Sequence, residues 1–144
     1  MTFLTLCCCS SGCSDIGLHK DIYDGILVTT YLTIICGCKL VLMLPPTAKA
    51  REVYEHYKEK AFPYPTIDTG LLKSVEELGG FSFILRPPRD YEEFVTLLIP
   101  RGWYHWLLNV SSWTVVFSGS QYPVQETVAA DELSTAHPSP SLRH

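Results

Sequence analysis

The sequence predicts one mainly β domain with a helical insert, and three features of the chain support this prediction. Runs rich in Val, Ile, Thr and aromatic residues occur before and after a central segment of helical character. Proline and glycine pairs separate these runs. The length of 144 residues fits a single domain. This order of elements suits a β-sandwich or β-barrel with helices inserted between strands.

Strand-like runs occupy both ends of the predicted domain. The first two lie on either side of Gly37, and Pro45-Pro46 ends the second. The later runs are rich in β-branched and aromatic residues. The predicted strands cover residues 25–35, 39–44, 81–85, 94–99, 106–110 and 113–117.

The helical insert is predicted over about residues 47–79. Thr47 can cap a helix to about residue 60, and Thr69 can cap a second helix over 71–78. Residues 1–15 are rich in Cys and Ser without a period, so we expect a poorly ordered lead. Residues 121–144 are rich in Ser, Pro and Ala and predict a disordered tail. The domain itself is therefore expected over residues 16–120.

Composition and cysteine placement narrow the class of protein. Apolar residues make up 47% of the chain and charged residues 18%, so the chain can bury a core. The net charge is −4 without a basic run, and direct contact with nucleic acid is not expected. Four of the six cysteines lie in the first thirteen residues, which suits reduced thiols rather than a disulfide framework. We expect an intracellular protein of the nucleus or cytoplasm.

Residues 26–44 allow a competing interpretation. This run is almost continuously apolar and long enough to span a bilayer. Lys39 falls within it, the Cys36-Gly37-Cys38 segment interrupts it, and its β-branched residues favour strands. We therefore expect two buried strands and no membrane association, with a small membrane-anchored protein as the alternative.

The tripeptide His19-Lys20-Asp21 is the sharpest candidate for chemistry. Residues two apart on a strand share a face, so His19 and Asp21 can present an imidazole and a carboxylate to one point. A second histidine would complete a facial triad of the kind that binds Fe(II) with open positions. His105 is the best candidate, because it follows a Pro/Gly turn between two strand-like runs. The spacing alone is weak support, since a His beside an Asp is more often simply solvated.

From Gly17 to Ser120 the sequence resembles the core of JmjC-domain and related cupin-like oxygenases, which use Fe(II) and 2-oxoglutarate. Four motifs occur in the family's order: LHKDIYD at 18–24, GCKLVLMLPP at 37–46, TLLIPRGWYH at 96–105 and a closing run at 113–120. The resemblance implies a double-stranded β-helix (cupin or jelly-roll) core with a helical insert. The core is expected to be incomplete, because eighteen residues precede His19.

The same resemblance assigns roles to four residues. It implies that His19, Asp21 and His105 hold Fe(II), and that Lys39 pairs with the far carboxylate of 2-oxoglutarate as co-substrate. No catalytic residue is expected beyond the metal ligands. The implied reaction is hydroxylation of a protein side chain or demethylation of histone lysine, on a protein or peptide such as a histone tail, if the metal site is intact.

Departures from the family pattern keep a second function open. Residues 29–35 look like an insertion between Asp21 and Lys39, and an insertion in a strand can turn side chains to the opposite face. A short N-terminal part would also leave strand edges exposed, which an oligomer could cover. The alternative is a non-catalytic cupin remnant that acts as a binding or scaffold element.

Overall fold

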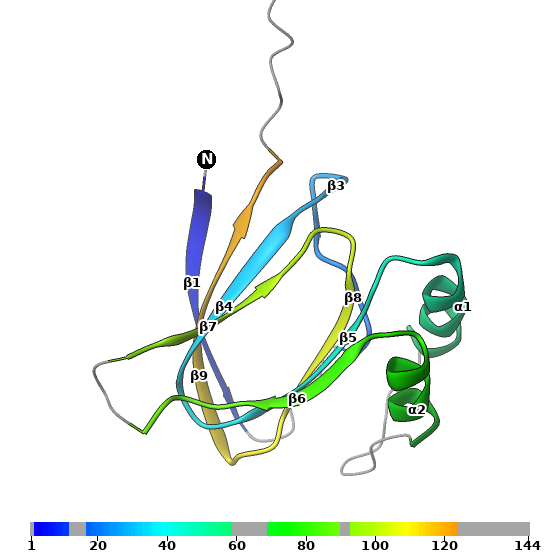
Figure 1. Cartoon of the computed structure of the whole chain (residues 1–144). Helices are drawn as coiled ribbons and strands as arrows, with labels where there is room; N and C mark the ends of the chain where they lie inside the picture. The colour runs from blue at the N-terminus through cyan, green and yellow to red at the C-terminus, as the bar shows by residue number, and fades with distance from the viewer. Residues whose placement is uncertain (1, 12–16, 59–68, 90–92, 124–144) are drawn as a thin grey trace, which may run out of the picture.

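Two antiparallel sheets face each other in the computed structural model, which describes residues 2–11, 17–58, 69–89 and 93–123 (Figure 1). Two helices lie on the outer side of one sheet (Figure 1). The strands are β1 (Thr2–Ser11), β2 (Ile22–Tyr23), β3 (Ile26–Leu27), β4 (Thr29–Cys36), β5 (Lys39–Leu44), β6 (Phe81–Leu85), β7 (Val95–Ile99), β8 (Tyr104–Asn109) and β9 (Trp113–Gln121). The helices are α1 (Ala48–Tyr57) and α2 (Thr69–Glu77).

The strand order defines a double-stranded β-helix, as predicted. One sheet has the order β1-β9-β4-β7 and the other the order β6-β5-β8, with β2 and β3 as a separate pair. The chain crosses between the two large sheets from β4 to β5, and again at each step from β6 through β9. All these pairings are antiparallel. This alternation is the winding of a cupin or jelly-roll core, and the fold is mainly β.

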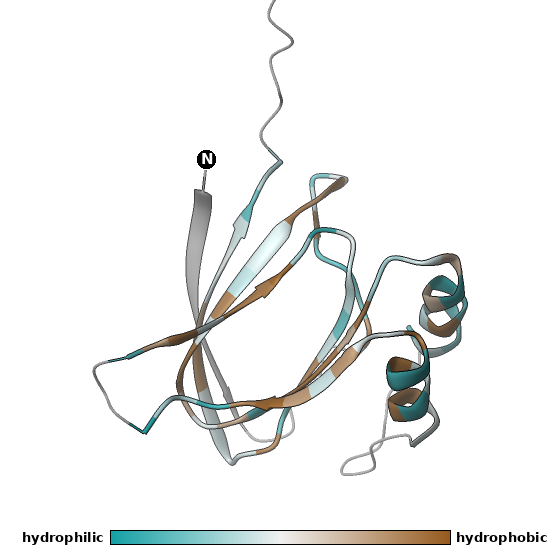
Figure 2. Cartoon of the chain, viewed as in Figure 1, coloured by the Kyte–Doolittle hydropathy of each residue, from teal (hydrophilic) through white to brown (hydrophobic). Residues whose placement is uncertain are grey.

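Strand β5 separates two hydrophobic cores, and all six of its residues are buried. Leu40, Leu42 and Leu44 pack toward the helices. Val41 and Met43 pack toward the opposite sheet, so the interior between the sheets is apolar there. Figure 2 shows hydrophobic residues along the strands of both sheets and a mixture of hydrophobic and hydrophilic residues on the helices. A strand buried on both faces reads as a continuous apolar run, which explains residues 39–44.

The predicted helical insert is present. The Thr47 side chain accepts a hydrogen bond from the Ala50 backbone N–H at 3.2 Å and caps α1. Leu71 and Val75 anchor α2 against the same core as α1. Residues 59–68 lie outside the described part of the chain, as does the predicted tail from residue 124 onward.

The start of the chain differs from the prediction of a poorly ordered lead. Residues Thr2–Ser11 form β1, which pairs with β9 from Thr2 opposite Gln121 to Ser11 opposite Trp113. This strand is stabilised by long-range backbone pairing with β9, so its local sequence pattern did not reveal it.

Residues 29–35, which the sequence analysis interpreted as an insertion, form part of a regular strand. These residues belong to β4, which pairs with both β9 and β7 inside its sheet. The short β2–β3 hairpin precedes this strand, and its turn has positive φ values at Asp24 and Gly25. A register shift between Ile34 and Cys36 in the β4–β9 pairing adjusts the strand further along.

The apolar run at residues 26–44 forms β3, β4 and β5 rather than a single helix. Across the described residues, no helix combines the length and the apolar character that a membrane crossing needs. The prediction of two strands that meet near Gly37 is confirmed.

Gly37, between β4 and β5, provides a test of the packing at this corner. Its φ is +81°, and an added Cβ would lie 2.0 Å from the Trp113 carbonyl oxygen. We expect Gly37→Ala to lower the free energy of unfolding by about 3 kcal/mol or more in urea denaturation. Gly25 has φ +77° with nothing within 4 Å, so Gly25→Ala measures the conformational cost alone, about 1 kcal/mol. Equal losses in the two variants would contradict the close approach at Trp113.

Candidate metal centre

One backbone bridge brings the two predicted histidine-bearing segments together. The His19 N–H donates to the His105 carbonyl oxygen at 2.9 Å, and the His105 N–H donates back to the His19 carbonyl oxygen at 2.8 Å. The bridge is isolated, so residue 19 is the point at which its segment joins the free edge of β8. The Val28 N–H then donates to the Asp21 carbonyl oxygen at 3.2 Å, at the base of the β2–β3 hairpin.

Alternation along β8 determines which side chains face the interior. Tyr104 and Trp106 belong to the core under the helices, whereas Leu107 packs into the core between the sheets. His105 lies two residues before Leu107, so its side chain faces the same side of β8, and it is 1% exposed. Leu18 packs on the helix side, so its neighbour His19 lies on the interior side.

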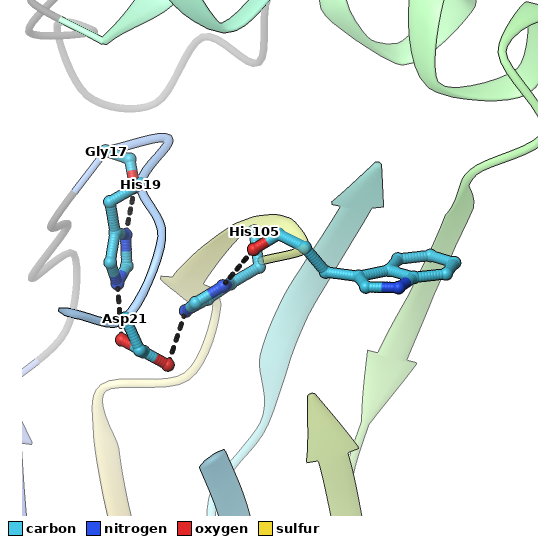
Figure 3. A network of polar contacts seen from close by, with 5 residues as sticks. Gly17, His19, Asp21 and His105 are labelled. Atoms are coloured by element: carbon cyan, nitrogen blue, oxygen red, sulfur yellow. Dashed lines mark hydrogen bonds and ion pairs between the residues drawn. The ribbon is translucent and has the colours of Figure 1, made fainter. Parts of the chain in front are cut away.

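The side chains of His19, Asp21 and His105 converge (Figure 3). The His19 Nε2 atom lies 3.6 Å from Asp21 Oδ1, and the His105 Nε2 atom lies 3.4 Å from Asp21 Oδ2. One ligand atom from each residue lies within 4.8 Å of the others. Adjacent ligands on a metal with bonds of about 2.1 Å lie roughly 3 Å apart. A small contraction would therefore bring all three groups to bonding distance of one cation.

Backbone carbonyls orient both imidazoles. The His19 Nδ1 lies 2.8 Å from the Gly17 carbonyl oxygen, and the His105 Nδ1 lies 3.4 Å from the Trp103 carbonyl oxygen. A carbonyl oxygen only accepts, so we assign the ring proton of each neutral imidazole to Nδ1. The Nε2 atom of each ring then faces Asp21 and is the atom available for metal ligation.

Burial and charge give this centre the character of a cation site. Burial lowers the pKa of His105, and this effect exceeds the opposing effect of the Asp21 charge. Burial raises the pKa of Asp21, but interaction with His19 and the charge of His105 outweigh it, so the pKa lies below its ordinary value. At neutral pH the centre thus presents an ionised carboxylate and a neutral His105, the forms that bind metal.

An unsatisfied oxygen atom supports the fit of a metal ion. Among the described residues, Asp21 Oδ2 and the Thr30 hydroxyl oxygen are buried and have no hydrogen-bond partner of normal geometry, although interaction with Thr30 helps to lower the pKa of Asp21 and His105 Nε2 lies 3.4 Å from Oδ2. A buried carboxylate oxygen without a donor is costly. A cation bound between the three side chains would remove that cost.

The metal-free protein is expected to lose stability as the pH falls below about 6.5, the ordinary pKa of histidine. Because the folded pKa of His105 is depressed, the unfolded chain binds a proton that the folded chain does not in the window between the two values. The free energy of unfolding therefore rises with pH through this window and levels off above it. Urea denaturation across the window should show this slope, and His105→Gln should flatten it. An unchanged slope in His105→Gln would place its origin elsewhere.

Lys39 lies on the same interior surface as His105. It shares its face of β5 with Val41 and Met43, and its ammonium donates to Asn109 Oδ1 at 2.5 Å. Met43 pairs with His105, and Lys39 pairs with Asn109. The positions of His105 and Lys39 are therefore four residues apart along the β5–β8 pair, a distance of roughly 13 Å.

Two polar residues near these sites escaped the sequence analysis. Asn109 is 1% exposed and Thr30 is half-buried beside Asp21. Asn109 follows His105 at a spacing of four, which on a strand keeps the two residues on one face. A polar residue at that position in an apolar strand was the available signal. Thr30 gave none, because threonine is ordinary in strands.

Comparison with known proteins finds similarity to solved structures but not to a protein family. No protein-family model and no curated protein matches the chain. One similar solved structure is a dTDP-4-dehydrorhamnose 3,5-epimerase from Bacillus anthracis str. Ames with TDP and PPi bound, at 14% sequence identity and a TM-score of 0.48. The match covers 98% of this chain and 68% of that chain. The fold is cupin-like. This assignment rests on the strand order described above, and the site on its own geometry.

Proposed function

We propose that the chain is an Fe(II)- and 2-oxoglutarate-dependent oxygenase that hydroxylates a protein side chain or demethylates a lysine. The observation that supports this function is the convergence of the His19, Asp21 and His105 ligand atoms within 4.8 Å. Two imidazoles and one carboxylate on one side of Fe(II) leave further coordination positions open. The same donor set suits non-haem iron better than a closed structural zinc site.

The residues of the chain have separate roles in this proposal. His19, Asp21 and His105 hold the metal, and the Nδ1 contacts to Gly17 and Trp103 fix the ring orientations. Bound iron and 2-oxoglutarate would together supply the oxidising chemistry. Lys39 would pair with the far carboxylate of 2-oxoglutarate. The roughly 13 Å between its position and that of His105 accommodates the co-substrate and the side chains at either end.

The interior around Lys39 and His105 is suited to exclude water. Residues of both sheets form an apolar cluster on the face of β5 and β8 that also bears Lys39 and His105, with Ile34 and Val41 fully buried in it. An apolar surrounding strengthens the pairing of an ammonium with a carboxylate. It also protects a reactive centre from solvent.

Exposed apolar residues support a macromolecular substrate. The β2–β3 hairpin begins directly after Asp21, and Ile22, Tyr23 and Ile26 are 56%, 54% and 46% exposed. A cluster of exposed apolar side chains next to a metal centre is typical of a surface that contacts a protein or peptide. A histone tail is one such peptide.

The proposal is tested by succinate formation from 2-oxoglutarate. The purified chain is loaded with Fe(II) without oxygen, then exposed to air and 2-oxoglutarate, and succinate is measured by NMR. We expect succinate that requires Fe(II), that is lost in His19→Ala and that is retained in His56→Ala, whose histidine is exposed on α1. Metal binding without succinate would overturn the oxygenase and leave a non-catalytic binding role.

A further inference from the structure

The residue between two of the metal ligands faces away from the metal. Alternation places Lys20 on the side of Leu18, toward the helices. The Lys20 ammonium lies 5.1 Å from the centroid of the Tyr104 ring and 5.8 Å from the centroid of the Tyr54 ring. Both distances lie within the range of cation–π attraction.

The two tyrosines join separate elements of the fold. Tyr54 belongs to α1, and Tyr104 directly precedes His105 on β8. Their rings stack with centroids 4.7 Å apart and an angle of 28° between the planes. Tyr104 is 5% exposed, so this pair is set in the core under the helices. Lys20 therefore connects the segment that bears two ligands to the strand that bears the third.

This connection matters because the ligand segment pairs with β8 at a single position. Within the described residues, its pairing with β8 is the single bridge between His19 and His105. A segment that joins β8 at one bridge and the β2–β3 hairpin through the Val28–Asp21 hydrogen bond can still twist about its own axis, and a twist moves His19 and Asp21 together. Burial of Leu18 and the contact of Lys20 with the tyrosines oppose this motion from the opposite face.

We infer that Lys20 is a positioning residue that sets the metal affinity of the His19–Asp21–His105 centre through its contact with Tyr54 and Tyr104. The inference rests on the metal site of the proposed function, and not on the oxygenase reaction. It also predicts that loss of Lys20 lowers the affinity for a cation, which is the opposite of what charge repulsion alone predicts. Removal of a positive charge near a cation site raises cation affinity by Coulomb's law, whereas loss of a positioning contact lowers it.

The experiment titrates Co(II) into the full chain without oxygen and follows the visible absorption of the bound ion. Lys20→Met keeps the length of the side chain and removes its charge. We expect Co(II) to bind about fivefold more weakly, with an altered absorption band. Lys20→Arg keeps a cation over the rings and should restore both the affinity and the band.

Lys58 provides a matched control. Its ammonium also lies 5.8 Å from the Tyr54 centroid, but it belongs to the end of α1 and not to the ligand segment. Lys58→Met should leave Co(II) affinity unchanged. Tyr54→Leu removes one of the two rings that Lys20 contacts and should weaken Co(II) binding by about twofold. This variant tests the same contact from the side of α1.

Three results with the variants would overturn the inference. Lys20→Met could bind Co(II) as tightly as the wild type or more tightly, Lys58→Met could weaken binding equally, or Lys20→Arg could fail to restore it. A wild-type chain that binds Co(II) but forms no succinate overturns only the oxygenase reaction. A wild-type chain that binds no Co(II) overturns the metal site and the inference together.

Discussion

Replacement of His105 with alanine is expected to weaken Fe(II) or Mn(II) binding by more than about a hundredfold. His105 is 1% exposed and supplies one of only three ligand atoms in the centre. The described residues contain no other group of three His, Cys, Asp or Glu side chains that could take over. Titration with Mn(II), followed by EPR of the unbound ion, measures the loss directly.

The structural consequence of His105→Ala must be separated from loss of a ligand. Truncation leaves Asp21 without its buried neighbour and is expected to lower the free energy of unfolding by about 2 kcal/mol. Binding is therefore measured well below the Tm of the variant. His56→Ala removes an exposed imidazole from α1 and should bind Mn(II) as the wild type does. Retention of stoichiometric tight binding in His105→Ala would show that the metal is held elsewhere.

Replacement of Lys39 with methionine is expected to weaken 2-oxoglutarate binding by about a hundredfold, because truncation of one partner of a buried charge pair costs several kcal/mol. Metal affinity should change little, since Lys39 lies at the Asn109 end of β8 and the ligands lie at the His105 end. Calorimetric titration of 2-oxoglutarate into the Mn(II)-loaded chain, without oxygen, measures this separation.

Two controls define what Lys39→Met shows. Lys39→Arg keeps the positive charge on the same interior face and should retain part of the affinity. Lys73→Met removes an exposed ammonium of α2 that pairs with Glu77 at 3.6 Å, and it should have no effect. Wild-type 2-oxoglutarate affinity in Lys39→Met would limit the role of Lys39 to its contact with Asn109.

The parts of the fold that the sequence predicted well are those with strong local signals. Residues 39–44 form a strand buried on both faces and ended by Pro45-Pro46, and β6 has the predicted bounds of 81–85. Thr47 caps α1 as its position predicted. The Asp24-Gly25 turn is also a strong local signal for a hairpin, which the sequence analysis did not use.

The remaining features depend on contacts between distant parts of the chain. Strand β1 forms because β9 offers a free edge, and its own Cys- and Ser-rich sequence has no alternation. The spacing of His19 and Asp21 indicated a shared face, but only the bridge to β8 places His105 beside them. The contact of Lys20 with Tyr54 requires α1 to pack on the sheet, which no local pattern reveals.

If the centre binds a metal ion, the reciprocal bridge between His19 and His105 links exchange of that ion to local unfolding. Detachment of the segment from β8 withdraws two of three donor atoms in one event, so escape of the ion and exposure of the bridging amides share a transition. Hydrogen exchange at the His19 and His105 amides should therefore slow when the ion is bound. The residence time of the ion on the protein would then follow the frequency of this opening rather than the strength of any one bond.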